Sequence, residues 1–370
     1  IAEVKGAGVQ VVMITGDRKE TAVAIAKDAG LLEKDTDVVL TSDELAKLSD
    51  DEIKKMLPNI RVIARALPSD KSRLVRLAQE LDLVAGMTGD GVNDSPALKK
   101  ADVGFARGGG TEVAKEASDI VILDDNFNSI DRAILYGRTI FNSIRKFIVF
   151  QLTINVSAVL ISFICPLIGI DNPLSVIQIL WVNLVMDTLA ALAFGGEPAL
   201  SRFMHEKTKR RTEQIISRNM MSQIITGAGW TFILSLALLV LGSFDADPNV
   251  PGVSFLESWG FLRQNTIEGE THMFLHTAYF AFFIFIAVFN AFNARTDRAN
   301  LFDNLGKNKG FLMVFGIIAV VQILMTYLGG AILSGYGLNA VEWLMVLVMA
   351  ISIIPVDLIR KGIAKAVSNK

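Results

Sequence analysis

Two aspartates four residues apart, Asp90 and Asp94, are well suited to hold a metal ion. They follow an apolar run, and Gly89 and Gly91 on either side of Asp90 let the backbone turn closely around the site. Closely placed carboxylates either share protons or bind a hard cation, and Mg²⁺ usually combines a few carboxylates with waters and phosphate oxygens. The pair therefore predicts a Mg²⁺ site used in phosphate chemistry.

Residues that can bind phosphate occur elsewhere in the first 100 residues. Lys71 stands near the start of a predicted helix and offers an ammonium group. Thr15, with the backbone N–H groups of Gly16 and Asp17, can bind phosphate oxygens. A lone Thr-Gly-Asp is a common turn with a capping Asp, so by itself it is weak evidence. Together with the aspartate pair, Thr15 and Lys71 each stand after a predicted strand or at a predicted helix start. This combination is much stronger evidence for a phosphate site than the single turn.

The elements that must position these residues alternate between strand and helix. Apolar runs typical of buried parallel strands cover residues 9–14, 61–65, 83–87, 103–105 and 120–123. Helical patterns lie between them, over 19–29 and from Pro68 onward. This alternation predicts an α/β doubly wound sheet, in which ligands bind outside the carboxyl ends of the strands.

The composition divides the chain into two parts. Of the 370 residues, 51% are hydrophobic and 20% are charged, and the charged residues are concentrated before residue 148. This excludes a single soluble globule and a disordered chain. The single cysteine excludes an intrachain disulfide, and a net charge of −2 gives no basic field for nucleic acid.

Six apolar stretches follow residue 147, and each approaches the roughly 20 residues that a helix needs to cross a bilayer. They cover about residues 148–170, 173–195, 219–243, 271–292, 311–330 and 338–359. The loops on one side and the C-terminal tail are rich in Lys and Arg, whereas the opposite loops contain only Arg263. We therefore expect a multi-pass protein with residues 1–147 and the C-terminus in the cytoplasm. From Asn128 no strong stop signal precedes the first span, which predicts one continuous helix.

Three stretches resemble the P-type cation pumps. They are residues 13–17 (Met-Ile-Thr-Gly-Asp), residues 64–72 around Pro-Ser-Asp-Lys-Ser, and the long, highly specific run 87–102 that begins Met-Thr-Gly-Asp-Gly-Val-Asn-Asp. Residues 117–127 and 181–188 narrow the resemblance to calcium pumps. With 150–156, the stretch 181–188 is most similar to the plasma-membrane branch.

The resemblance covers essentially the whole chain and implies its organisation. Residues 1–127 would be the C-terminal part of a haloacid-dehalogenase-like phosphorylation domain, 128–147 a stalk helix, and 148–370 an all-α bundle of six transmembrane helices. Asp90 would bind Mg²⁺ with support from Asp94, and Lys71, Thr15 and Gly16 would contact the transferred phosphoryl group. The residues implied near ATP are Thr15, Gly16, Asp17, Arg65, Lys71 and Asn93.

Parts of such a pump do not occur in this sequence. The Asp-Lys-Thr-Gly-Thr string with the phosphorylated aspartate is not present, nor is the Thr-Gly-Glu of the dephosphorylating domain. We therefore expect that this chain alone does not turn over ATP. Its missing partner would be the N-terminal part of the same pump, with the actuator, the nucleotide-binding domain and the first four membrane helices. The short tail after Pro355 favours a pump of a bacterial cytoplasmic membrane, and we expect the pump to be monomeric.

Asp187 lies inside the second predicted span, where an ionised carboxylate is costly and so indicates function. Asn183 is four residues earlier on the same α-helical face, and Asn155 lies in the preceding span. A carboxylate with amide oxygens suits Ca²⁺, although helix–helix hydrogen bonding by the two asparagines is the alternative. Ala158 and Ala287 stand where two-site calcium pumps carry acids or amides, so we expect one Ca²⁺ per cycle.

Three functions compete at this point. The leading interpretation is ATP-driven Ca²⁺ export through an aspartyl phosphate, with a P-type pump for another cation as its close variant. A membrane-anchored phosphatase of the same superfamily would use the Mg²⁺ site but leave Asp187 without a role. A passive channel or secondary carrier would leave Lys71 and the aspartate pair unexplained.

Overall fold

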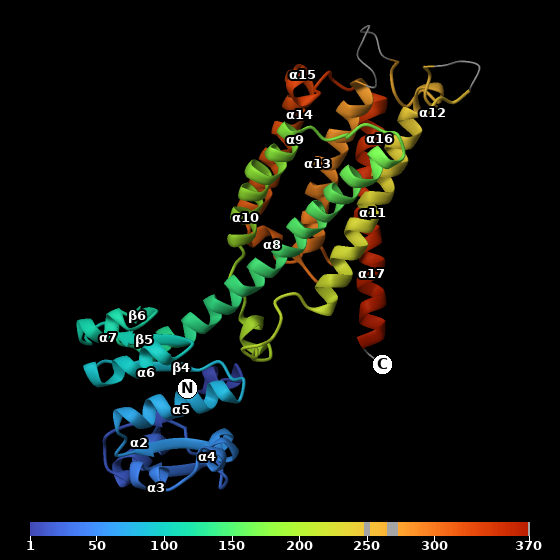
Figure 1. Cartoon of the computed structure of the whole chain (residues 1–370). Coiled ribbons are helices and arrows are strands. Elements are labelled where there is room, and N and C mark those ends of the chain that lie inside the picture. The colour runs from blue at the N-terminus through green and yellow to red at the C-terminus, as the bar shows by residue number, and fades with distance from the viewer. Residues whose placement is uncertain (248–251, 265–272, 369–370) are drawn as a thin grey trace. The chain divides into compact units, whose positions relative to one another are not determined.

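The computed structural model describes residues 1–247, 252–264 and 273–368. The contacts divide the chain into two units (Figure 1). The α/β unit comprises residues 1–139 and 199–214, and the helical unit comprises 140–198 and 215–370. Residues 271 and 272 of the predicted fourth span and the last two residues of the chain lie outside the described residues.

The α/β unit contains two three-stranded parallel sheets, with strand orders β1-β3-β2 and β4-β5-β6. The strands are β1 (Met13–Ile14), β2 (Val38–Thr41), β3 (Ile60–Ala64), β4 (Gly86–Gly89), β5 (Val103–Arg107) and β6 (Ile120–Ile122). The α/β class is confirmed, and all the predicted strands are present. The additional strand β2 was not expected, because it is short and follows a charged turn. The sheet that the alternation predicts is present as two separate halves.

Helices pack on these sheets through their apolar faces. They are α1 (Ala2–Gly6), α2 (Lys19–Asp28), α3 (Ser42–Ala46), α4 (Asp50–Met56), α5 (Pro68–Glu80), α6 (Ser95–Lys100) and α7 (Glu112–Glu116). Helix α5 contributes to two cores: Leu77 packs with the β1-β3-β2 half, and Val75 packs with Met87 and the β4-β5-β6 half. Because α5 carries Lys71, its packing on both halves fixes that residue relative to both.

The loop that follows the second predicted span belongs to the α/β unit. Arg138 donates hydrogen bonds to the carbonyls of Phe203, Met204 and Ala7. Farther along the loop, Arg211 is paired with Asp102 at 2.8 Å. These contacts hold residues 199–214 to the strands and to α1. The sequence had placed this loop in the membrane domain, and that boundary remains a prediction.

The helical unit contains six helices long and apolar enough to cross a membrane, which confirms the six predicted spans. They are α8 (Phe127–Leu167), α9 to α10 (Val176–Gly195), α11 (Arg218–Ser243), α13 (Met273–Arg295), α14 (Lys309–Leu328), and α16 with α17 (Ala340–Ser368). Helix α8 is a single ribbon of 41 residues (Figure 1). Shorter elements at the ends are α12 (Phe255–Ser258) and α15 (Gly330–Leu333). Helix α13 is the most buried, with 89% of its apolar window inside the unit.

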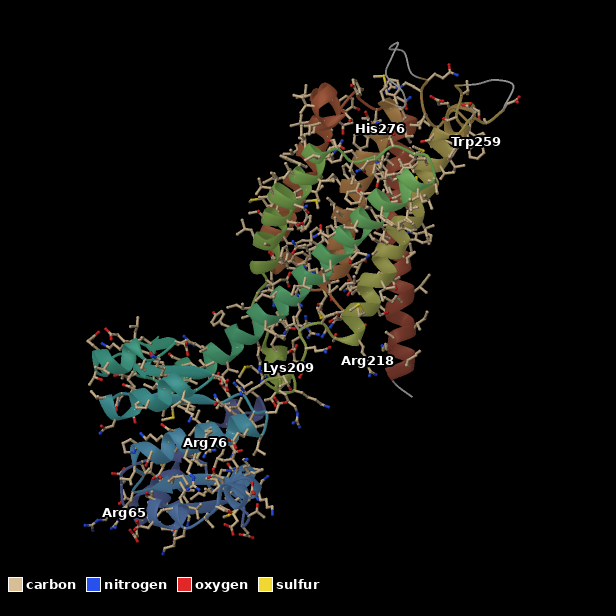
Figure 2. The ribbon with its side chains drawn as sticks, viewed as in Figure 1. Arg65, Arg76, Lys209, Arg218, Trp259 and His276 are labelled. Atoms are coloured by element: carbon tan, nitrogen blue, oxygen red, sulfur yellow. The ribbon has the colours of Figure 1, made fainter. Side chains whose placement is uncertain are left out.

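A buried carboxylate of the helical unit, Glu197, is paired with a buried arginine. Glu197 accepts hydrogen bonds from Arg295 at 3.0 Å and from Asn308 at 2.9 Å. Pairing of this kind offsets part of the cost of placing charge in an apolar environment. Figure 2 labels Arg218 at one end of the helical unit and Trp259 and His276 at the other.

Candidate phosphoryl-transfer and ion sites

Lys71 and Asp94, two of the predicted site residues, form an ion pair. Lys71 Nζ lies 2.6 Å from Asp94 Oδ1, and the Asp94 side chain is almost completely buried. The second oxygen of Asp94 accepts a hydrogen bond from the backbone N–H of Asp90 at 3.2 Å. A Cβ atom on Gly89 would lie 2.5 Å from the Cβ of Asp94, so this position requires glycine. Asp94 therefore orients Lys71 and also fixes the loop that carries Asp90.

Asp90 is exposed at the end of β4 and faces a cation that the sequence analysis missed. Arg107 Nη1 lies 3.0 Å from Asp90 Oδ2, and its Nη2 lies 3.4 Å from Asp125. The signal for this contact was the sheet order, because Arg107 ends β5 and β5 pairs in parallel with β4. Next to Asp125, the Ser129 hydroxyl donates to Asp124 at 2.8 Å and lowers the pKa of that carboxyl.

The residues around Asp90 fit a Mg²⁺ ion bound mainly through one carboxylate. Asp90 offers an exposed carboxylate, whereas both oxygens of Asp94 are already hydrogen-bonded. Within the described residues no three His, Cys, Asp or Glu side chains are grouped so that they could hold a metal ion. Such a donor set suits Mg²⁺, which keeps waters and substrate phosphate oxygens as its other ligands. Asn93 beside it is exposed.

The remaining predicted phosphate and nucleotide residues gather at the carboxyl ends of β1 and β3. Thr15 Oγ1 donates to Asp17 at 2.7 Å and accepts from the Asp17 N–H at 3.2 Å. The backbone N–H of Arg65 donates to the Asp17 carbonyl at 2.9 Å. Arg65 has a positive φ of 51°, and its exposed side chain projects outward (Figure 2). A Cβ atom added at Gly16 would have no other atom within 4 Å, so this residue borders open space.

The three-glycine loop after β5 packs behind Asp90. Thr111 donates its backbone N–H to the Asp90 carbonyl at 2.8 Å. A Cβ atom on Gly110 would lie 3.0 Å from that same carbonyl oxygen. The glycines allow this close approach, so the loop supports the backbone around Asp90.

In the helical unit, Asp187 is 5% exposed and is contacted by a residue that the sequence analysis did not select. Gln151 Nε2 donates to Asp187 Oδ2 at 3.2 Å, and Asp187 Oδ1 is buried without a hydrogen-bond partner. Asn155 is half-buried one turn beyond Gln151 on α8. A buried carboxylate with one unpartnered oxygen and an amide side chain hydrogen-bonded to the other has the chemistry of a cation site.

Asn183 and Asp187 differ in their surroundings. Asp187 is buried, whereas Asn183 is exposed. Trp181–Met186 forms a π-helical segment between α9 (Val176–Leu180) and α10 (Asp187–Gly195), so Asn183 lies inside the π turn and Asp187 directly after it. Residues four apart stay on nearly the same side of the helix in a π turn as in an α-helix, so the two side chains differ in burial and not in the side from which they project. Within the described residues neither asparagine is hydrogen-bonded to Asp187.

Comparison with known families follows the same division of the chain. The family described as "Cation transporting ATPase, C-terminus" matches residues 171–363, and "haloacid dehalogenase-like hydrolase" matches residues 1–102. The chain belongs to the cation-transporting ATPases. Its α/β unit is accordingly a haloacid-dehalogenase-like domain, and its six apolar helices are those of a multi-pass membrane protein.

This ATPase chain is similar to calcium transporters of several eukaryotes. It is 36% identical over 356 residues to calcium-transporting ATPase 2 of Schizosaccharomyces pombe, covering 95% of the chain and 26% of the relative. It is 39% identical over 365 residues to plasma membrane calcium-transporting ATPase 1 of Mus musculus, covering 93% of the chain and 29% of the relative. It is 37% identical over 375 residues to calcium-transporting ATPase 8, plasma membrane-type, of Arabidopsis thaliana, covering 99% of the chain and 34% of the relative. The chain thus spans about a quarter to a third of the length of these relatives.

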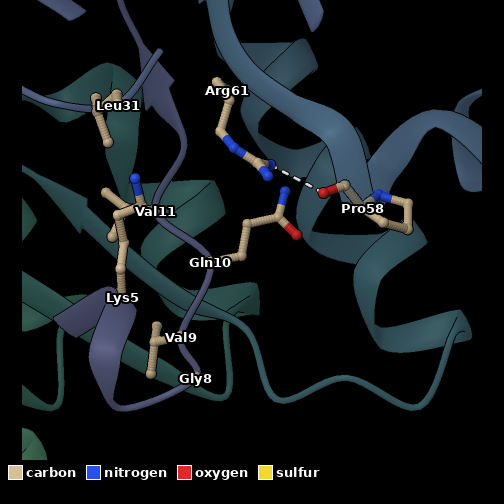
Figure 3. A pocket seen from close by; sticks show the side chains of 8 residues that line it. All are labelled: Lys5, Gly8, Val9, Gln10, Val11, Leu31, Pro58 and Arg61. Atoms are coloured by element: carbon tan, nitrogen blue, oxygen red, sulfur yellow. Dashed lines mark hydrogen bonds between the residues drawn. The ribbon is translucent and has the colours of Figure 1, made fainter. Parts of the chain in front are cut away.

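A cavity of about 220 Å³ elsewhere in the α/β unit of the ATPase does not have the character of an active site (Figure 3). Both cations in its wall are engaged. Lys5 is paired with Glu33 at 2.7 Å, and Arg61 donates to the Pro58 carbonyl and is paired with Asp37. The strand ends described above therefore remain the candidate site in the α/β unit.

Proposed function

We propose that this chain is the C-terminal part of an ATP-driven pump that exports Ca²⁺ through an aspartyl-phosphate intermediate. The observation that carries the proposal is the buried Asp187 carboxylate within a membrane span. A membrane-anchored phosphatase has no use for such a residue, and a passive channel has none for the Lys71–Asp94 pair. Calcium transport by the relatives supports Ca²⁺ as the cargo.

In the phosphoryl site the protein's main task is positioning and charge neutralisation. Asp90 would hold Mg²⁺, which neutralises charge on the transferred phosphoryl group, while Asp94 keeps Lys71 pointed at that group. Thr15 and Gly16 would donate hydrogen bonds to its oxygens. Asp17, Arg65 and Asn93 would lie along the bound nucleotide, with Arg65 placed by its hydrogen bond to the Asp17 carbonyl.

The rest of the pump would supply the phosphorylated aspartate, the nucleotide-binding and actuator domains, and four further membrane helices. The sheets offer a place for part of it. Within the described strands, β1 pairs only with β3 and β4 pairs only with β5, so each sheet has an open edge beside a predicted phosphate-binding loop. Strands with free N–H and C=O groups readily accept another strand. We expect a strand from the missing part to pair with one of these edges in a monomeric pump.

The proposed cycle moves one Ca²⁺, bound by Asp187, Asn155 and Asn183 with ligands from the missing helices. Ala287 is fully buried in α13 and Ala158 is half-buried in α8. Neither side chain can compensate the charge of a second divalent ion inside the bilayer. We place the pump in a bacterial cytoplasmic membrane, with the α/β unit and the C-terminus in the cytoplasm.

Two variants of the complete pump test this function. Asp187→Asn should lose high-affinity ⁴⁵Ca²⁺ binding yet still form a phosphoenzyme from inorganic phosphate, because its Mg²⁺ site is intact. Asp90→Asn should show the reverse, with Ca²⁺ binding kept and phosphoenzyme lost, since a Mg²⁺ ligand is gone.

Wild-type protein should bind one Ca²⁺ per catalytic site without cooperativity. Two cooperatively bound ions would contradict the stoichiometry, and unchanged Ca²⁺ affinity in Asp187→Asn would contradict the ion site.

A further inference from the structure

The environment of Asp187 is incomplete for a buried charge. One oxygen accepts a single hydrogen bond, from Gln151 at 3.2 Å, and the other is buried without a partner. Buried polar atoms are nearly always paired, and an unpaired carboxylate oxygen in a membrane is costly. The unpaired oxygen of Asp187 is therefore available to a cation or another ligand.

Gln151 is positioned to share that role. It lies four residues before Asn155 on α8, so the two amides lie on one face of the helix. Both are half-buried, whereas Thr153 and Ile154 between them are buried against other helices. Within the described residues, the Nε2 group of Gln151 is bonded to Asp187 and its Oε1 has no hydrogen-bond donor. One amide group thus holds the aspartate and leaves a neutral oxygen free beside it.

The geometry points to Gln151 as a further residue of the cation site, which positions Asp187 through Nε2 and offers Oε1 as an additional oxygen ligand to a divalent cation. This inference rests on the proposed function, because it assumes that Asp187 binds the transported ion. Ca²⁺ accepts six to eight oxygen ligands, including neutral amide carbonyls, so a fourth side chain from these two spans fits its needs. A smaller set of neutral oxygens would leave more of the ion's charge to the single carboxylate.

The competing interpretation is that the hydrogen bond only packs α8 against the second span. Interhelical hydrogen bonds in membranes contribute modestly, and many are replaceable. The two interpretations differ in what they demand of the side chain. Packing requires a residue of similar shape, whereas the ion site requires an oxygen beside Asp187.

The test uses the complete pump with Gln151→Leu and, as a matched control, Gln322→Leu. Gln322 is another buried glutamine of the helical unit, on α14, and its Nε2 donates to the Thr326 hydroxyl one turn along the same helix. We expect Gln151→Leu to weaken equilibrium ⁴⁵Ca²⁺ binding about tenfold, equivalent to about 1.4 kcal/mol, with the number of sites unchanged. Phosphoenzyme formation from inorganic phosphate should remain at the wild-type level, and its inhibition by Ca²⁺ should require about tenfold more Ca²⁺. Gln322→Leu should leave both the ⁴⁵Ca²⁺ binding and the inhibition of phosphoenzyme formation by Ca²⁺ unchanged.

Gln151→Glu separates ligation from packing. It keeps an oxygen at the site and adds negative charge but cannot donate to Asp187, so Ca²⁺ affinity should fall less than in Gln151→Leu. Wild-type affinity in Gln151→Leu would overturn the inference, as would equal losses in the Leu and Glu variants. If Asp187→Asn weakens Ca²⁺ binding and Gln151→Leu does not, the inference fails while the proposed function stands. If neither Asp187→Asn nor Gln151→Leu weakens Ca²⁺ binding, both the inference and the proposed function fail.

Discussion

At the scale of single residues, Arg107 is a cation within hydrogen-bonding distance of the predicted Mg²⁺ ligand Asp90. Its positive charge opposes the arrival of Mg²⁺, so Arg107→Met should tighten Mg²⁺ binding. Both side chains are half-exposed and the interaction is screened by salt, which limits the effect to about threefold to tenfold at low ionic strength.

The measurement is the Mg²⁺ concentration that half-saturates phosphorylation of the complete pump by inorganic phosphate, together with direct Mn²⁺ binding followed by electron paramagnetic resonance. Arg107→Lys is the control, because it keeps the charge and should stay close to the wild type. The difference between Met and Lys variants should shrink as salt is added. A weaker Mg²⁺ affinity in Arg107→Met would mean that Arg107 assists the site.

Single residues also show where sequence reasoning stops. Lys71, Asp90 and Asp94 were selected because residue type and position after a strand or at a helix start are properties of the chain itself, and the structure joins Lys71 to Asp94. Arg107 and Gln151 were missed because their importance depends on a neighbour far along the chain. The partner of Arg107 directly follows the adjacent strand β4, and the partner of Gln151 lies 36 residues away.

At the scale of elements, α4 is held to α5 by an exposed ionic network. Asp50 accepts hydrogen bonds from Arg76 at 2.6 Å and Arg73 at 2.8 Å. The guanidinium of Arg76, and next that of Arg73, lowers the pKa of Asp50 below its ordinary value of 3.8. A lowered pKa means that the stabilisation is complete above that ordinary value and is lost as the pH falls through the lowered pKa.

The lowered pKa of Asp50 predicts that acid loosens α4 before it affects the buried core. Cleavage by pepsin within residues 50–59 should accelerate as the pH falls below about 4. Asp50→Asn should show faster cleavage of the same segment by a neutral protease at pH 7. Asp51→Asn, on the same turn, is the control. Equal protection of Asp50→Asn and wild-type protein at neutral pH would rule out a role for this network.

Helices and strands were predicted well where the spacing of apolar residues follows a regular helix or strand. They were predicted poorly where the backbone leaves that regular geometry. The six spans and the strand–helix alternation follow from long apolar runs, and both are confirmed. The π-helical Trp181–Met186 was not predicted, because its apolar sequence is equally compatible with an ordinary α-helix. That segment contains Asn183 and ends directly before Asp187. The candidate ion site was therefore predictable in its residue types and not in its geometry.

At the scale of the whole molecule, helix α8 is the element that contains residues of both units. Its residues up to Thr139 belong to the α/β unit and those from Ile140 to the helical unit, without a break in the helix. It carries Arg138, which binds the loop 199–214, and it carries Gln151, which binds Asp187. A continuous helix resists bending, so displacement of one of its ends is transmitted to the other.

A proline at Ile140 tests this coupling, since proline inside a helix removes a hydrogen bond and costs about 3 kcal/mol or more. In the complete pump, Ile140→Pro should keep ⁴⁵Ca²⁺ binding and phosphorylation by inorganic phosphate, because neither site contains residue 140. Ca²⁺ should no longer suppress that phosphorylation, since the occupied ion site cannot act on the phosphoryl site through a broken helix. Ile140→Ala is the control, because Ile140 is 59% exposed and alanine preserves the helix. Full suppression by Ca²⁺ in Ile140→Pro would show that the signal travels by another route, for which the loop 199–214 and its bonds to Arg138 are the alternative.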